Sequence, residues 1–392
     1  MSEFIPLSVP NFCGNERKYV DEALEGAWVS TSGAKVGEME ECIAKYVGMP
    51  QAVCCASGSA ALHLAALTAG VKPGDEVIVP ALTFIASVNP TTRYVGAQPV
   101  FFGCDETATM DPDAVEDFCA NQCELKADGL YNKRTGARVS ALVLVHVFGN
   151  MADMPRLLDI ARRYDLILIE DATEALGTHY TAGPLAGKFA GTMGDVGCYS
   201  FNGNKIITTG AGGMLVSNHA DWAARAKHLS TQAKTDTLQF LHDEVGYNYR
   251  MTNVQASLGL AQLARLEDFI AVKQARYDQY RRGLDGVRGL RILPFRDEEG
   301  TVRSNHWFFS LDLRGAGLDR DRFIAGLQAR NIQTRPVWAL IHEQADYPKN
   351  EAYGLDKALG YRAGIVNLPC STNLTEADCD RVIEAVLALA AG

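Results

Sequence analysis

The sequence contains no CxxC pair and no histidine at metal-ligand spacing from any of its ten cysteines, so we expect no metal site. Basic residues are fewer than acidic ones: the chain has 37 Lys and Arg and 47 Asp and Glu, which gives a net charge of −10. We therefore expect neither nucleic acid nor a membrane as a partner. This charge balance leaves small anionic ligands open.

Long hydrophobic runs are lacking as well, although 47% of the 392 residues are hydrophobic. The longest stretch without a formal charge, residues 46–71, contains Gly48, Pro50 and His63, which would be costly in lipid. We expect a strand, a turn and a buried helix there. The first residues, MSEFIPLSVP, show no basic segment followed by an apolar one. Together with the many unpaired thiols, this predicts a cytoplasmic protein.

The first half of the chain alternates short apolar runs with helical patterns. The runs are AVCCA, EVIVP, PVFF, ALVLVHV and LILIE, and helices are expected at 59–69, 84–94, 111–120 and 153–164. This alternation is typical of βαβ units, and it predicts an α/β fold with a mainly parallel sheet that has helices on both faces.

The pattern changes after residue 171, and the length of the chain allows two to three domains at roughly 150 residues each. Helices are expected at 219–230 and 252–285, and a final helix opens with the capping box of Thr375 and Asp378. We predict a large domain over residues 1–255, with an N-terminal arm. A linking helix and a small C-terminal α+β domain are expected over 256–392.

Two polar features follow predicted strands, where an α/β sheet binds its ligands. The turn Ser57-Gly58-Ser59-Ala60 opens a helix, whose free N–H groups suit a phosphate, although a plain helix cap explains the same residues. Asp171 ends the apolar run LILIE-D, and a carboxylate at the end of a buried strand needs a cation or several donors. It could equally cap the next segment.

Two further residues lie at comparable places. Lys205 lies in the glycine-bearing stretch SFNGNKIITTGAGGM, as either a solvated lysine or an amine that acts as a nucleophile. Phe84 follows a strand end, where an aromatic face can stack on a ring or simply fill the core. A phosphate turn, an aromatic ring, an acid and a lysine together indicate a site for pyridoxal 5′-phosphate.

These residues lie within longer motifs that resemble the sugar aminotransferases of the DegT/DnrJ/EryC1/StrS family. The matching text is GNERKYVDEALEGAWVSTSG, CASGSAALHLAAL, VIVPALTFIASVNP, EDATEALG, YSFNGNKIITTGAGGM and GYNYRMTNVQASLGLAQL. The resemblance covers the whole chain. It implies the fold-type I architecture, with a mainly parallel seven-stranded sheet in the large domain.

The resemblance also implies a role for each matched residue. Lys205 would form the Schiff base with the cofactor and move the proton, while Asp171 would pair with the pyridine nitrogen. The residues implied to hold the phosphate, to stack on the ring or to face its phenolic oxygen are Ser59, Ala60, Phe84, Glu174, Ser200 and Asn248. Among these, Asn248 would reach across the interface of a homodimer with shared active sites, and Glu174 stands where many relatives have glutamine.

The resemblance also implies contacts with the sugar substrate. The residues expected to contact it are Ser30, Thr31, Asn202, Asn204, Arg335 and His342. Arg335 and His342 could instead be ordinary solvated loop residues. Trp307 begins a predicted strand, and we expect it to pack in the core or at an interface.

The insertion LYNKRTGARVSALVLVHVFGN resembles one branch of the family, which leads toward bacillosamine or legionaminic acid. The implied reaction transfers the amino group of L-glutamate to the C4 keto group of a UDP-linked 4-keto-6-deoxy-N-acetylhexosamine. Pyridoxamine 5′-phosphate would carry the amino group between the two half-reactions. A GDP- or dTDP-linked ketosugar is the alternative substrate.

Three alternative functions would each require a sequence feature that can be checked in this chain. The family's dehydratases have histidine in place of Lys205. A DNA-binding regulatory member would carry a helix with clustered Lys and Arg, and we find none in the sequence. A NAD-dependent enzyme would have a GxGxxG turn after its first strand, where this chain has Ser57-Gly58-Ser59-Ala60.

Overall fold

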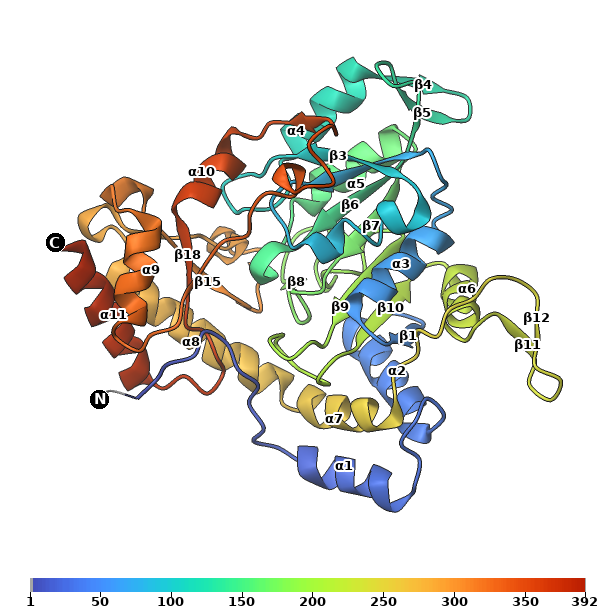
Figure 1. Cartoon of the computed structure of the whole chain (residues 1–392), viewed down its shortest axis with the longest axis horizontal. Coiled ribbons are helices and arrows are strands. Elements are labelled where there is room, and N and C mark those ends of the chain that lie inside the picture. The colour runs from blue at the N-terminus through green and yellow to red at the C-terminus, as the bar shows by residue number, and fades with distance from the viewer. Residues whose placement is uncertain (1–2, 392) are drawn as a thin grey trace.

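The computed structural model describes residues 3–391 and contains a large sheet beside a smaller one (Figure 1). In the large sheet the order is β1-β10-β9-β7-β6-β2-β3-β17. β10 runs antiparallel to β1 and β9, and the remaining pairs along this path are parallel, which confirms the predicted α/β fold. The bounds are β1 Ala52–Cys55, β2 Glu76–Pro80, β3 Gln98–Phe102, β6 Arg138–Val145, β7 Ile167–Asp171, β9 Val196–Ser200, β10 Gly213–Ser217 and β17 Ala352–Tyr353.

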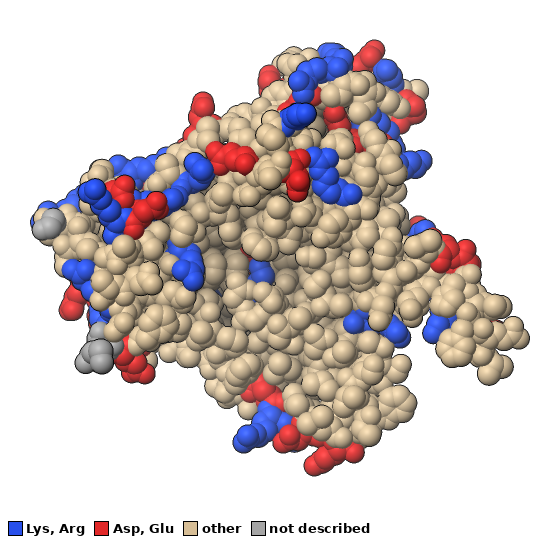
Figure 2. Space-filling view, in the orientation of Figure 1, with Lys and Arg blue, Asp and Glu red and all other residues tan. Residues whose placement is uncertain are grey.

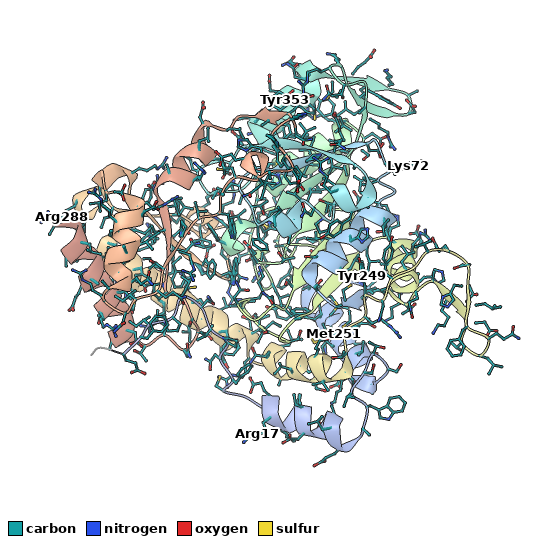
Figure 3. The ribbon with its side chains drawn as sticks, in the orientation of Figure 1. Arg17, Lys72, Tyr249, Met251, Arg288 and Tyr353 are labelled. Carbon is teal, nitrogen blue, oxygen red and sulfur yellow. The ribbon has the colours of Figure 1, made fainter. Side chains whose placement is uncertain are left out.

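Three strands extend the seven that were predicted. The hairpin of β4 (Cys123–Lys126) and β5 (Gly129–Asn132) pairs with β6. β17 comes from the C-terminal part of the chain and pairs with β3, where the ring of Tyr353 (Figure 3) stacks on Phe102 with centroids 5.5 Å apart. With only two residues, β17 is too short to show a periodic pattern in the sequence.

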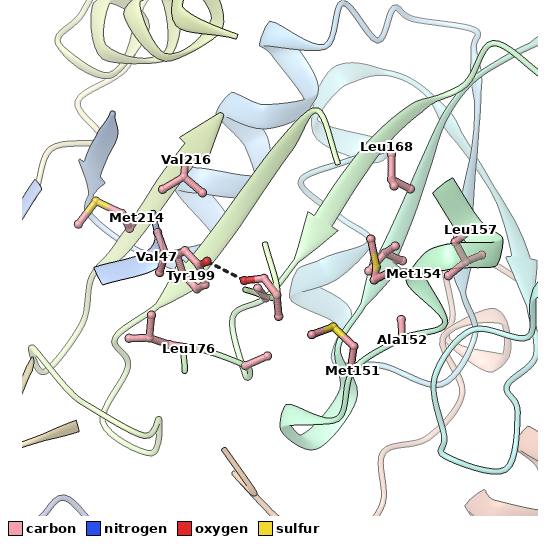
Figure 4. Packing of buried hydrophobic residues seen from close by; sticks show 14 of the residues in the cluster. Val47, Met151, Ala152, Met154, Leu157, Leu168, Leu176, Tyr199, Met214 and Val216 are labelled. Atoms are coloured by element: carbon pink, nitrogen blue, oxygen red, sulfur yellow. Dashed lines mark hydrogen bonds between the residues drawn. The ribbon is translucent and has the colours of Figure 1, made fainter. Parts of the chain in front are cut away.

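Helices cover both faces of the large sheet because successive strand residues point to opposite sides. Leu168 of β7 belongs to the hydrophobic cluster that contains residues of α2, α5 and α7, whereas the next residue, Ile169, belongs to the cluster that contains residues of α3 and α6. Figure 4 shows part of the first cluster, including the hydroxyl of Tyr199 that donates to the carbonyl of Ala190 over 2.6 Å. The helices of this part are α1 Glu16–Glu25, α2 Ala34–Val47, α3 Gly58–Thr68, α4 Pro112–Asp117, α5 Met154–Arg163, α6 Ala220–Ser230 and α7 Asn253–Leu263.

The smaller sheet has the order β13-β15-β18-β16 and its own hydrophobic cluster. Its bounds are β13 Arg291–Ile292, β15 Phe309–Asp312, β16 Arg335–Pro336 and β18 Ile365–Leu368, with α9 Arg320–Gln328, α10 Asp356–Gly364 and α11 Glu376–Ala390. The other strands form two short pairs, β8 His179–Tyr180 with β14 Val302–Arg303 and β11 Lys234–Asp236 with β12 Leu241–His242.

The helix α8 (Leu266–Leu284) joins the two parts of the molecule. Its first turns pack in the cluster of the large sheet through Leu266 and Phe269, and its last turns pack in the cluster of the small sheet through Tyr280 and Leu284. The division into domains at residues 255 and 256 stays a prediction, and its residues 1–2 and 392 lie outside the described chain.

Two of the expected helices are wrong in extent. Residues 84–94 form two short 3-10 turns, η1 (Ile85–Ser87) and η2 (Arg93–Val95), instead of one helix. Between them lies Pro90, which has no N–H to donate and disfavours helical geometry at the residue before it. The helix expected over 252–285 is divided into α7 and α8 at residues 264–265.

Charged side chains of both signs lie close to one another on the face of the molecule that Figure 2 shows. Of the helices within residues 3–391, none combines the length and the apolar composition that a membrane crossing requires.

The predicted capping box of α11 is confirmed, and it gives a test of the fold. Thr375 Oγ1 accepts from the Asp378 N–H over 3.1 Å, and Asp378 Oδ2 accepts from the Thr375 N–H over 3.2 Å. Thr375→Ala removes the first bond and should lower the free energy of unfolding by about 1 kcal/mol, measured by urea denaturation. Thr181→Ala, at an exposed loop threonine, is the control; equal stability of both variants would contradict the prediction.

Candidate functional site

A cavity of about 340 Å³ lies at the carboxyl ends of β7 and β9, beside the first turn of α3. This is the edge at which α/β sheets bind ligands. The predicted residues that line it are Ser59, Phe84, Asp171, Glu174, Ser200, Asn202, Asn204 and Lys205. The structure therefore brings residues from distant parts of the sequence into one site.

The amine of Lys205 lies between a carboxylate and an aromatic ring. Its Nζ is 3.5 Å from Glu174 Oε1 and 3.9 Å from the centroid of the Trp307 ring. A carboxylate and a ring face both attract an amino group, so the two neighbours hold the end of the Lys205 side chain between them. The amine is thereby held in the cavity and kept from swinging freely into solvent.

Glu174 is buried beside Lys205 and has an unusual electrostatic environment. Its Oε2 accepts the backbone N–H of Phe148 over 2.8 Å. Burial raises the pKa of Glu174 to about 7, although Lys205 and the Phe148 N–H act in the opposite direction. Phe148 has a φ of 60°, which is uncommon outside glycine and typical of strained functional sites. Glu174 can therefore gain or lose a proton near neutral pH.

Asp171 is the last residue of β7 and is buried. Its Oδ1 accepts the N–H of Thr173 over 3.0 Å. Its Oδ2 is buried without a hydrogen-bond partner among residues 3–391, although Asp171 lines the cavity. A buried carboxylate oxygen without a partner is costly, so this geometry suits a ligand that brings a positively charged N–H donor.

The start of α3 forms the end of the cavity that suits an anion. Ser57 caps the helix by accepting the N–H of Ala60 over 3.1 Å. Among the described residues that line the cavity, Ser57, Gly58 and Ser59 represent this turn and Ala60 does not, so the predicted role of Ala60 stays a prediction. The first helical N–H groups, at Gly58 and Ser59, have no partner within the helix. A Cβ at Gly58 would lie 2.9 Å from the Cβ of Ser200, so glycine is needed for this close approach.

Aromatic rings form the opposite side of the cavity. The side chain of Phe84 is 53% exposed, and its ring centroid lies 6.4 Å from that of Trp338. Trp338 in turn stacks on Phe148 with centroids 5.0 Å apart. This arrangement leaves one face of Phe84 free to cover a planar ligand.

The remaining predicted residues do not line this cavity, within the part of the chain that the structure describes. Ser30 and Thr31 lie in the loop before α2, where the Ser30 carbonyl accepts the N–H of Asn253 over 2.7 Å. The residues Asn248 and Arg335 are exposed, and His342 lies in a 3-10 turn (Ile341–Glu343) with its ring 6.2 Å from Phe101. Their assignments stay predictions.

The sequence reasoning missed the two tryptophans of the cavity. Trp307 packs in the hydrophobic cluster of the small sheet, which confirms the expected core position, but its ring also lies beside the Lys205 amine, which was not predicted. Trp338 lies in the short segment after β16. Because each is far from Lys205 in sequence, local spacing offers no signal for either.

The residues present fit pyridoxal 5′-phosphate. Asp171 offers its free oxygen to a protonated ring nitrogen, and Phe84 offers a ring face. The N–H groups at the start of α3, with Ser59 and Ser200, offer donors to a phosphate. Lys205 offers the amine that this cofactor needs, so all four requirements are met in one cavity.

Comparisons with known proteins agree with this fit. The model of the DegT/DnrJ/EryC1/StrS aminotransferase family matches residues 12–387. The chain is 39% identical over 383 residues to the GDP-perosamine synthase of Caulobacter vibrioides, with 97% of each chain covered. It is 34% identical to the GDP-perosamine synthase of Escherichia coli O157:H7, with 98% of each covered.

A solved structure shows the same architecture. The Streptococcus pneumoniae protein Spr1654 in its PMP form is similar to this chain with a TM-score of 0.84 and 25% identity, over 99% of each chain. The chain therefore belongs to the DegT/DnrJ/EryC1/StrS family of aminotransferases, which use pyridoxal 5′-phosphate to aminate sugars.

Proposed function

We propose that the chain transfers the amino group of L-glutamate to the C4 keto group of a nucleotide-linked 4-keto-6-deoxyhexose. The observation that carries this proposal is the presence, in one cavity, of the Lys205 amine and of Asp171 Oδ2, which has no partner among residues 3–391. An amine and a buried acid in this arrangement suit the Schiff-base chemistry of transamination.

The names of two relatives favour a different nucleotide on the substrate from the one that the sequence resemblance implies. The resemblance in the sequence pointed to a UDP-linked N-acetylhexosamine, whereas the two relatives described above are GDP-perosamine synthases. Perosamine is a 4-amino-4,6-dideoxyhexose, so the predicted position of amination agrees with their product. Their names favour a GDP-linked sugar here, and the UDP-linked sugar is the second candidate.

Each residue of the site has a chemical task in this reaction. When bound, pyridoxal 5′-phosphate supplies an electron-accepting ring. Asp171 would hold a proton on the ring nitrogen through the oxygen that has no partner among the described residues, and Ser59 and Ser200 would hold the phosphate. Lys205 Nζ would act as the general base that removes the proton from the carbon bearing the donor's amino group, and as the general acid that later returns it.

Glu174 holds a proton next to this amine. With a pKa of about 7, it is partly protonated at neutral pH and lies 3.5 Å from Lys205 Nζ. The protonated carboxyl can donate a hydrogen bond to an oxygen of a bound ligand, and the carboxylate can stabilise the lysine ammonium. Trp307 and Trp338 exclude water from the same region.

A homodimer with shared sites is part of the proposal. The segment around β11 and β12 projects from the large sheet (Figure 1) and exposes large apolar side chains, among them Leu238 at 86% and Val245 at 80%. Asn248, which was predicted to reach across the interface, lies just after this segment and is exposed. Exposed apolar side chains of this size are typical of a surface that another subunit covers.

The substrate assignment is tested by offering the protein L-glutamate, pyridoxal 5′-phosphate and one ketosugar at a time. The panel is GDP-linked 4-keto-6-deoxymannose, UDP-linked 4-keto-6-deoxy-N-acetylglucosamine and dTDP-linked 4-keto-6-deoxyglucose. We expect mass spectrometry to detect amination at C4 of the GDP-linked sugar. Turnover of the UDP-linked sugar alone would favour the second candidate, and turnover of none would contradict the proposal.

Lys205→Ala is the matched test of the catalytic assignment. Removing the amine should lower kcat by about 10²- to 10⁴-fold, the usual contribution of a general acid or base. Lys188→Ala, at an exposed lysine outside the cavity, should keep the activity of the unchanged protein. Multiple turnover at the normal rate by Lys205→Ala would show that another residue moves the proton.

Glu174→Gln tests the protonation of Glu174 by its effect on stability. Burial raises the pKa from 4.5 to about 7, so the folded protein holds a proton that the unfolded chain releases at lower pH. The contribution of Glu174 to the free energy of unfolding is fully present below pH 4.5. It falls by about 3 kcal/mol as the pH rises from 4.5 through about 7.

Urea denaturation of the cofactor-free protein measures this loss. The unchanged protein should lose stability relative to Glu174→Gln between about pH 4.5 and 7, and the difference should then level off. Glu25→Gln, at an exposed glutamate of α1, is the control and should follow the unchanged protein. Parallel profiles for the unchanged protein and Glu174→Gln would show that the burial of Glu174 does not raise its pKa.

A further inference from the structure

A buried lysine lies behind the cavity. Lys273, in the middle of α8, is 2% exposed. Its Nζ donates to the carbonyl of Trp307 over 2.7 Å and to the carbonyl of Cys370 over 2.6 Å. Among the described residues, no carboxylate forms an ion pair with it. Lys273 is therefore a buried amine held by two backbone carbonyls.

The burial of the Lys273 amine lowers the stability of the fold unless a compensating interaction is present. Taking an ammonium out of water is strongly unfavourable unless the protein replaces its hydrogen bonds, and an apolar side chain would pack at lower cost. Burial lowers the pKa of Lys273, as expected from this cost. The two carbonyls that it joins belong to residues 307 and 370, beside β15 and β18 of the small sheet. Lys273 thus ties both of these segments to α8.

One of the two segments leads directly to the catalytic amine. The indole Nε1 of Trp307 donates to the carbonyl of Asn204 over 2.6 Å, and the same ring lies 3.9 Å from Lys205 Nζ. Trp307 is thus fixed at its carbonyl by Lys273 and at its indole by the residue before Lys205. A displacement of Trp307 would move both the ring beside the amine and the backbone that carries it.

We propose that Lys273 is a positioning residue for Lys205 and acts on it through Trp307. This inference rests on the proposed function, because it assigns Lys273 a part in the same reaction. Lys273 fixes the carbonyl of Trp307, Trp307 fixes the turn at Asn204, and the ring of Trp307 sets the direction of the Lys205 amine. Proton transfer needs this amine within bonding distance of the reacting carbon, so a small displacement slows the reaction.

The test compares Lys273→Met, Trp307→Leu and the double variant in the full-length protein. In the cofactor-free protein we measure the rate at which Lys205 reacts with added pyridoxal 5′-phosphate at saturation. In the loaded enzyme we measure kcat and KM separately. Each single variant should lower both the reaction rate and kcat by about 10- to 100-fold, with KM for the sugar changed by less than about 3-fold.

The double variant identifies the route. If Lys273 acts through Trp307, then adding Lys273→Met to Trp307→Leu should lower neither rate further. Tyr280→Phe is the matched control, since the Tyr280 hydroxyl also joins α8 to the segment after β18, by donating to the Pro369 carbonyl over 3.1 Å. It removes a buried hydrogen bond of the same helix that does not involve Trp307, so both rates should stay unchanged.

Three results would overturn the inference: unchanged rates in Lys273→Met, multiplied losses in the double variant, or an equal loss in Tyr280→Phe. If Lys273→Met fails to fold, Trp307→Leu must still slow the reaction of Lys205 with the cofactor, and normal speed there would overturn the inference. A failure of the proposed function is distinguishable, because the reaction of Lys205 with pyridoxal 5′-phosphate requires no sugar substrate.

Discussion

The site depends on one buried carboxylate. Asp171 ends β7 in the centre of the large sheet, and one of its oxygens has a backbone donor while the other has no partner among the described residues. Such an oxygen costs stability in the free protein, and a positively charged donor in the cavity would remove this cost. In the proposed reaction, the burial that makes the lone Asp171 carboxylate unfavourable would also make it effective at keeping a ring nitrogen protonated. Relief of this unfavourable burial would therefore contribute to the binding of the cofactor.

The topology of the sheet places the other groups around this carboxylate. β7 lies between β6 and β9, so the segment after β6 supplies the Phe148 N–H to Glu174, and the end of β9 supplies Ser200. The small sheet completes the site from the other side, because Trp307 precedes β15 and contacts both Asn204 and Lys205. The cavity thus lies where the two sheets meet, and the packing of α8 in both hydrophobic clusters holds them together.

The sequence predicts those residues of the site that a nearby sequence pattern marks, and it does not predict contacts between residues that are far apart in the chain. Asp171, Ser59 and Lys205 follow strands or open a helix, and short apolar runs and turn residues are sufficient to locate such places. Trp307 donates to the carbonyl of Asn204, which is 103 residues away in the sequence, so no local sequence pattern predicts this contact. Lys273 looks like an ordinary helix surface residue in the sequence, although it is buried. The helix expected over 84–94 is wrong because Pro90 lies within it, and the chain forms two short 3-10 turns on either side.

The most direct test of this account concerns the proton that Asp171 is inferred to hold on the ring of the cofactor. The protein would be loaded with pyridoxal 5′-phosphate that carries ¹⁵N in its ring, and the nitrogen chemical shift would be measured. The account predicts a protonated ring nitrogen in the unchanged protein and loss of this protonation in Asp171→Asn. An unprotonated nitrogen in the unchanged protein would show that the buried carboxylate serves another purpose.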